Sequence, residues 1–102
     1  MFVTQDDIRI VLSKDLELNV DTPPFKSFFI SRILEPMRVK DSETVRSGDL
    51  PPEKMLSYEV IAEGGILREV VVRNYGGEKR LREIKSTCRW TLEKMYERLR
   101  FS

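Results

Sequence analysis

The sequence has no histidine and only one cysteine, Cys88, in 102 residues. Without these residues it cannot form a Cys–His or Ser–His catalytic pair or the usual set of zinc ligands. We therefore predict that the protein is not an enzyme and needs no metal or cofactor. A lone cysteine also excludes an internal disulfide and fits a reducing cytoplasm.

Long apolar segments are missing as well. No run approaches the roughly 18 residues that a membrane-spanning helix needs, and residues 1–7 lack the basic and apolar regions of a signal peptide. The chain is 40% hydrophobic and 34% charged, which is typical of a globular protein, and we predict a single cytoplasmic domain over residues 1–102. Few amides beside many Glu, Lys and Arg residues favour a thermophilic source.

Charge is distributed unevenly, although the formal net charge is only +1. The segment 78–100 carries eight basic and four acidic residues, so the rest of the chain is net negative. This asymmetry predicts a polyanionic or acidic partner.

Two regions alternate apolar and polar residues with the period of a β-strand. The first covers about residues 6–20 and is either one long strand with a bulge near Lys14-Asp15 or a hairpin; residues 1–15 are an N-terminal extension or part of this first strand. The second covers residues 56–73 and contains Gly64-Gly65, which can adopt the positive φ angles of a tight hairpin turn.

The first helix is expected to start at residues 21–24, where a polar cap precedes proline. Its apolar face would comprise Phe25, Phe28, Phe29, Ile30, Ile33, Leu34 and Met37. Pro36 disfavours helical geometry at the residue before it, so we predict that the helix ends near Glu35. The polar residues 38–55 would then form a long loop.

The C-terminal segment shows the clearest helical periodicity. Its apolar stripe recurs every three or four residues: Leu81, Ile84, Cys88, Leu92, Met95 and Leu99. On this stripe Cys88 is interpreted as a small buried residue. The elements follow the order β-α-β-β-α, which predicts an α+β fold in which an antiparallel sheet of three to four strands carries two helices on one face.

Trp90 is a large aromatic residue on the polar side of this helix, because it projects about 180° from the centre of the apolar stripe. Phe101 falls close to the same side. Large aromatics and arginine are enriched at binding hot spots, so we predict a protein-binding surface formed by Trp90, Phe101 and Arg89. The alternative is one tolerated surface tryptophan beside a frayed terminus.

The basic residues of the same helix suggest a second kind of surface. The candidate phosphate-binding residues are Arg82, Arg89, Lys94, Arg98 and Arg100. The alternative is a solvated helix face on which Glu and Lys residues pair. A third possibility, ranked last because no pocket is indicated, is a small enzyme that uses Glu59, Glu63 or Glu69.

At the start of the expected first helix, Val20 and Pro24-Phe25-Lys26-Ser27 form a Val-Pro-Phe-x-Ser pattern with three residues inserted. With further short motifs over about residues 16–100, this pattern resembles the small dimerisation subunit of the KEOPS complex, whose first helix opens with Val-Pro-Phe-x-Ser. The family's Val-Asp-x-Glu is similar to the run at residues 39–43. Leu81-Arg82 with Ser86-Thr87, and the Arg89-Trp90 pair, resemble motifs of its second helix. The extra N-terminal dozen residues, a longer loop over 43–55 and the altered Asn-Ser pair favour a divergent paralogue.

The resemblance implies a β-α-β-β-α fold and a non-catalytic role in tRNA modification. Members of the family dimerise through sheet edges and dock on the threonylcarbamoyl-transferase subunit through their helices. They help the complex to handle tRNA. The implied docking surface includes the first helix, with Phe28 and Ile30, and the Trp90 face. The expected partners are a second copy or a related small subunit, the transferase, and tRNA.

Overall fold

A computed structural model describes residues 1–101 of the chain and the side chains of residues 1–100. The strands are β1 (Phe2–Val3), β2 (Ile8–Val11), β3 (Ser57–Glu63) and β4 (Ile66–Arg73). A π-helical segment, η1 (Phe25–Leu34), continues directly into α1 (Glu35–Arg46), and the two are called the first helix below. A short 3-10 turn, η2 (Pro52–Lys54), precedes β3, and α2 (Glu78–Phe101) ends the described chain.

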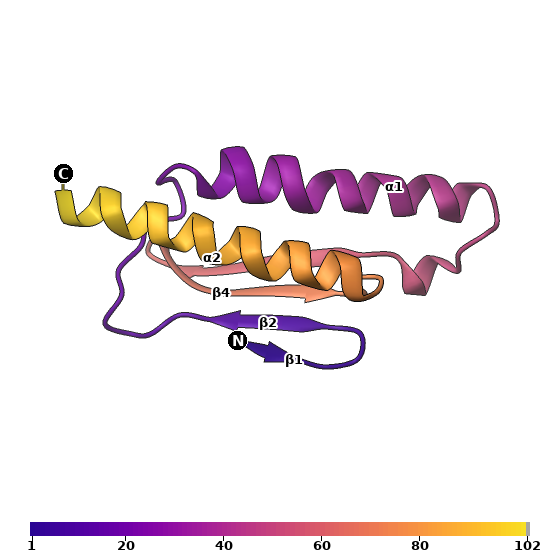
Figure 1. Cartoon of the computed structure of the whole chain (residues 1–102), viewed down its shortest axis with the longest axis horizontal. Coiled ribbons are helices and arrows are strands. Elements are labelled where there is room, and N and C mark those ends of the chain that lie inside the picture. The colour runs from indigo at the N-terminus through magenta and orange to yellow at the C-terminus, as the bar shows by residue number, and fades with distance from the viewer. Residues whose placement is uncertain (102) are drawn as a thin grey trace.

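The four strands form one antiparallel sheet in the order β1-β2-β4-β3. The first helix and α2 run side by side in opposite directions over one face of this sheet (Figure 1). The predicted α+β class, with an antiparallel sheet and two helices on one face, is therefore confirmed. The prediction lacked the short β1, which pairs with β2 at one edge.

Within the region 6–20 the chain forms β2 and, further along β4, one isolated bridge between Asn19 and Ile66. After β2, the amide of Leu12 donates to the carbonyl of Arg68 at 3.0 Å, and the amide of Leu67 donates to the carbonyl of Leu18 at 2.7 Å. Residues 13–17 loop out between these two neighbouring points on β4. The chain thus keeps its direction along β4, as a bulged strand would and a hairpin would not, but regular strand structure in this region is confined to Ile8–Val11.

The predicted end of the first helix near Glu35 is wrong, and so is the loop assigned to residues 38–46. The prediction assumed that Pro36 would keep Glu35 out of helical geometry, but Glu35 has helical angles, with φ −63° and ψ −44°. In η1 the backbone instead bonds five residues back, as when the amide of Glu35 donates to Ile30. Pro36 then occupies the first turn of α1, where no amide donor is needed. The cap prediction also fails, because the N-cap position falls on Pro24 without a side-chain hydrogen bond.

The core lies between the sheet and the two helices. The hairpin predicted over residues 56–73 forms β3 and β4, and Gly64 and Gly65 have φ angles of 57° and 82° in its turn. Most of the predicted stripe of α2 is buried there, including Cys88. Leu99 departs from the prediction and is 49% exposed, because it lies near the end of α2, which extends past the sheet (Figure 1).

The opposite face of the sheet carries no helix among residues 1–101 (Figure 1). Side chains on this face alternate between apolar residues, such as Ile61 and Val71, and charged ones, such as Arg9 and Glu69. In the described part of the chain, no helix is both long enough and apolar enough to cross a membrane.

Candidate functional site

The surface shared by the two helices contains an aromatic contact between Phe28 and Trp90. The two rings meet edge to face, with centroids 5.1 Å apart. Trp90 remains 44% exposed, so the predicted exposure of this residue is confirmed. The contact with Phe28 was not predicted, because α2 packs against the first helix as well as against the sheet.

Lys94 belongs to the same aromatic group. Its ammonium nitrogen lies 6.0 Å from the Trp90 ring centroid and 3.3 Å from a carboxylate oxygen of Glu97. These contacts place Lys94 beside Trp90 and away from the arginines of α2 that are described next. The predicted phosphate-binding set therefore does not form one cluster.

The remaining basic candidates divide between two places. Arg82, Arg89 and Arg100 are exposed and seven or eleven residues apart, so they project from one flank of α2. Arg98 instead lines a hollow of about 520 Å³ together with Glu17 and Asp21 of the segment before the first helix. The structure thus brings three of the five predicted residues to one flank.

Ile30 lies away from the Trp90 face. It lines an apolar groove of about 480 Å³ between η1 and β3, with Val20, Phe25, Val60 and Ala62. Because β3 is an edge strand, this groove runs beside backbone groups that no other strand of residues 1–101 pairs with. The predicted protein-binding residues thus occupy two sites, since Phe28 and Trp90 meet while Ile30 faces β3. The side chain of Phe101 lies outside the described part.

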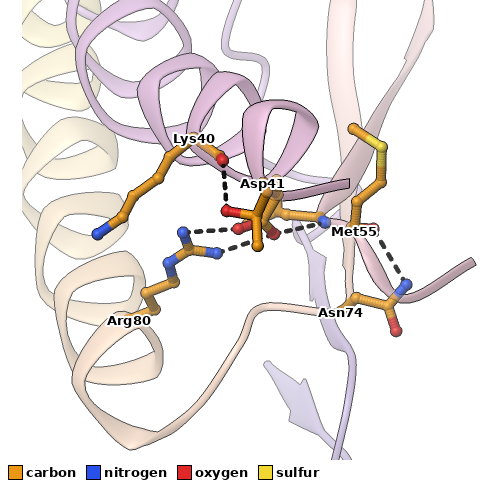
Figure 2. A network of polar contacts seen from close by, with 7 residues as sticks. Lys40, Asp41, Met55, Asn74 and Arg80 are labelled. Atoms are coloured by element: carbon orange, nitrogen blue, oxygen red, sulfur yellow. Dashed lines mark hydrogen bonds and ion pairs between the residues drawn. The ribbon is translucent and has the colours of Figure 1, made fainter. Parts of the chain in front are cut away.

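A largely buried ion pair joins the two helices near the start of α2 (Figure 2). The Arg80 guanidinium donates to both carboxylate oxygens of Asp41, at 2.9 and 3.0 Å. Asp41 also accepts the backbone amide of Leu56 at 2.8 Å. Burial alone would raise the pKa of Asp41, but the hydrogen bonds from Arg80 and Leu56 outweigh it and lower that pKa.

This ion pair was not predicted from the sequence, because Asp41 falls in the residues that were assigned to a loop. A signal was present, since Ile33, Met37 and Asp41 follow one another at four-residue spacing on one helix face. The position of Arg80, the other member of the ion pair, depends on a glycine. A Cβ atom at residue 76 would lie 3.0 Å from a guanidinium nitrogen of Arg80. Gly76 therefore leaves room for Arg80 to reach Asp41.

A second polar contact ties α1 to β3. Glu35 accepts hydrogen bonds from Arg38 and from the Tyr58 hydroxyl. The hydrogen bond from Arg38 and, to a smaller extent, that from Tyr58 lower the pKa of Glu35 to about 2. Burial and the neighbouring Glu35 carboxylate raise the pKa of Tyr58 to about 12.

Of the three carboxylates considered for catalysis, Glu59 and Glu69 line one hollow of about 600 Å³ on the open face of the sheet. Glu69 is paired with Arg9 on the open face of the sheet, and the Glu63 carboxylate lies 4.0 Å from Arg68. Burial raises the pKa of the Cys88 thiol to about 12, which keeps it protonated at neutral pH. No group of three or more potential metal ligands occurs among residues 1–101.

Comparisons with known proteins return no match to a family model, a curated protein or a solved structure.

Proposed function

We propose that this protein is a non-catalytic dimerisation and scaffold subunit, in particular the small subunit of a KEOPS-like complex that forms threonylcarbamoyl-adenosine in tRNA. The observation that carries the proposal is the Phe28–Trp90 contact. It places a half-exposed Trp90 of α2 against a partly buried Phe28 of the first helix, and helices are the docking elements in the family that the sequence resembles. An aromatic side chain already held by a neighbour loses little conformational entropy on binding.

Dimerisation is supported by the free edge of β3. Val60 and Ile61 are 37% and 36% exposed on this edge strand. If two copies pair antiparallel about a twofold axis at Val60, Glu59 lies opposite Ile61 of the other copy and not opposite another glutamate. The pairing therefore brings no like charges directly opposite each other.

The test is light scattering after size exclusion, with the protein alone and with a purified transferase subunit. We expect a dimer alone and a stable complex with the transferase. Trp90→Ala should keep the dimer and weaken the transferase complex at least tenfold, whereas Val60→Lys should yield a monomer.

The matched control is Tyr96→Ala, because Tyr96 is another aromatic residue of α2 and is 46% exposed, close to the 44% of Trp90. It should leave both assemblies intact. A monomeric wild-type protein that fails to bind the transferase would refute the proposal.

A second candidate is a stand-alone RNA- or DNA-binding domain, which is favoured by the exposed flank of Arg82, Arg89 and Arg100. It predicts that the isolated chain binds a single-stranded RNA oligonucleotide with an affinity that falls steeply with salt. Arg82→Glu/Arg89→Glu should abolish this binding in a fluorescence anisotropy titration. Unchanged affinity in the double variant would exclude the flank as the binding site.

A further inference from the structure

A basic cleft lies between the first helix and α2, on the side of α2 that faces the first helix. It has a volume of about 280 Å³, and its lining residues are Arg32, Ile33, Pro36, Met37, Lys40, Lys79, Arg80 and Glu83. Four of these eight residues are basic, and they come from both helices. In Figure 2 the side chains of Lys40 and Arg80 both extend into the space between α1 and α2.

Most of this positive charge is not neutralised within the described part of the chain. Arg80 is paired with Asp41, but Arg32, Lys40 and Lys79 form no salt bridge with any residue in 1–100. The lining contains one further acidic residue, Glu83. Three unpaired cations against one carboxylate leave an excess of two positive charges in the cleft.

The position of this charge on α2 opposes the stability of the helix. Lys79 and Arg80 lie in the first turn beside Glu78, and the helix dipole disfavours the two positive side chains there while it favours the negative one. Asp41 compensates Arg80 and also attracts Lys40, whereas Arg32 and Lys79 line the same cleft without a salt bridge. A local arrangement that costs stability without an internal partner is typical of a functional site.

The apolar residues at the base of the cleft strengthen the electric field of its basic side chains. Ile33 and Met37 are buried and Pro36 borders them, so one wall is apolar and of low dielectric. Fields from like charges are focused in such a cleft and attract counter-ions of high charge density. We propose that the cleft between α1 and α2 binds phosphate groups through Arg32, Lys40 and Lys79.

The phosphates can belong to a nucleic-acid backbone or to a small phosphorylated molecule, and two probes separate these sources. The first is a fluorescent single-stranded RNA oligonucleotide, followed by anisotropy, and the second is inorganic tripolyphosphate, followed by calorimetry. Binding of the RNA alone identifies a backbone site, whereas saturable binding of tripolyphosphate identifies a site for a small ligand. Either result supports phosphate binding in the cleft, provided that the cleft variants described next weaken the binding of that probe.

Lys40→Gln/Lys79→Gln should lower the affinity for the bound probe at least tenfold. For RNA, three phosphate contacts predict a log–log salt slope of about −2, which the double variant should reduce to about −0.7. The matched control is Lys14→Gln/Lys54→Gln, which removes the same charge outside the cleft and should change the affinity less than about threefold. Circular dichroism checks that both variants are folded.

A gain of affinity provides an independent test. Glu83→Gln removes the one unpaired carboxylate of the lining, and it should tighten binding by about threefold because its repulsion of phosphate is lost. The proposal is overturned if neither probe binds, or if the cleft variants and the control variants bind equally. The RNA site would instead lie on the arginine flank if Arg82→Glu/Arg89→Glu lost RNA binding while Lys40→Gln/Lys79→Gln kept the affinity of the wild type.

Discussion

The first helix and α2 are held together by two contacts of opposite character. Near the start of α2, Asp41 and Arg80 form an ion pair whose side chains are only 12% and 18% exposed. Near the middle of α2, Phe28 and Trp90 meet through their rings, and Trp90 is 44% exposed. The polar contact is thus the buried one, and the apolar contact is the one open to solvent.

This reversal separates the contact that stabilises the fold from the contact available for binding. Asp41 joins three parts of the chain, since it receives hydrogen bonds from Arg80 of α2 and from Leu56 before β3. Removing one partner of such a buried network leaves charged and polar groups unsatisfied. Trp90 keeps much of its surface in water, so a partner protein can still gain apolar contact there.

The largest effect is expected from Asp41→Ala. It should lower the free energy of unfolding by about 3 kcal/mol, because the Arg80 charge and the Leu56 amide lose their acceptor in a nearly buried place. The measurement is urea unfolding at neutral pH. The control is Glu97→Gln, which breaks the exposed Lys94–Glu97 pair beside Trp90 and should cost less than about 0.5 kcal/mol.

The loss of stability at acid pH tests the role of the buried Asp41–Arg80 contact in a second way. The folded state lowers the pKa of Asp41 below its ordinary value of 3.8, so its stabilising effect is present above that pH and is lost as the pH falls through the folded pKa. Asp41→Asn cannot titrate, and its stability should therefore fall less steeply than that of the wild type below about pH 4. Equal acid slopes would mean that the Asp41 carboxylate does not support the fold.

Elements with strong periodicity were predictable from the sequence. The hairpin of β3 and β4 combines period-two alternation with Gly64-Gly65, and α2 repeats its apolar stripe over about five turns, so local and tertiary preferences agree. The first helix was predictable only to Glu35, because a π-helical segment that accommodates Pro36 has no sequence signature of its own. Asp41 continues the face of the first helix that carries Ile33 and Met37, but it is a charged residue at a position where an apolar one was expected. Residues 38–46 therefore showed no helical periodicity and were predicted to be a loop.

Of the features of the candidate surfaces, the exposure of single residues was predictable from the sequence, but their arrangement was not. The helical angle of Trp90 gave its exposure correctly, whereas its partner Phe28 depends on how two helices pack, which no local pattern contains. Likewise, Arg82 and Arg89 share a flank because of their spacing within one helix. The basic cleft unites Arg32, Lys40 and Lys79 from two helices, and only the tertiary structure brings them together.

The smallest expected effect is the coupling between Phe28 and Trp90, and it decides how separate the two contacts are. Unfolding of Phe28→Ala, Trp90→Ala and the double variant should give a coupling energy of about 1 kcal/mol, as for other edge-to-face pairs. The control cycle of Phe28 with Tyr96 should show none, since no ring contact joins them among the described side chains. A coupling near zero would leave Trp90 unsupported by the first helix, whereas one as large as the Asp41 effect would make Trp90 part of the core. The intermediate value fits an aromatic side chain that is oriented by its neighbour and still has a face to offer a partner.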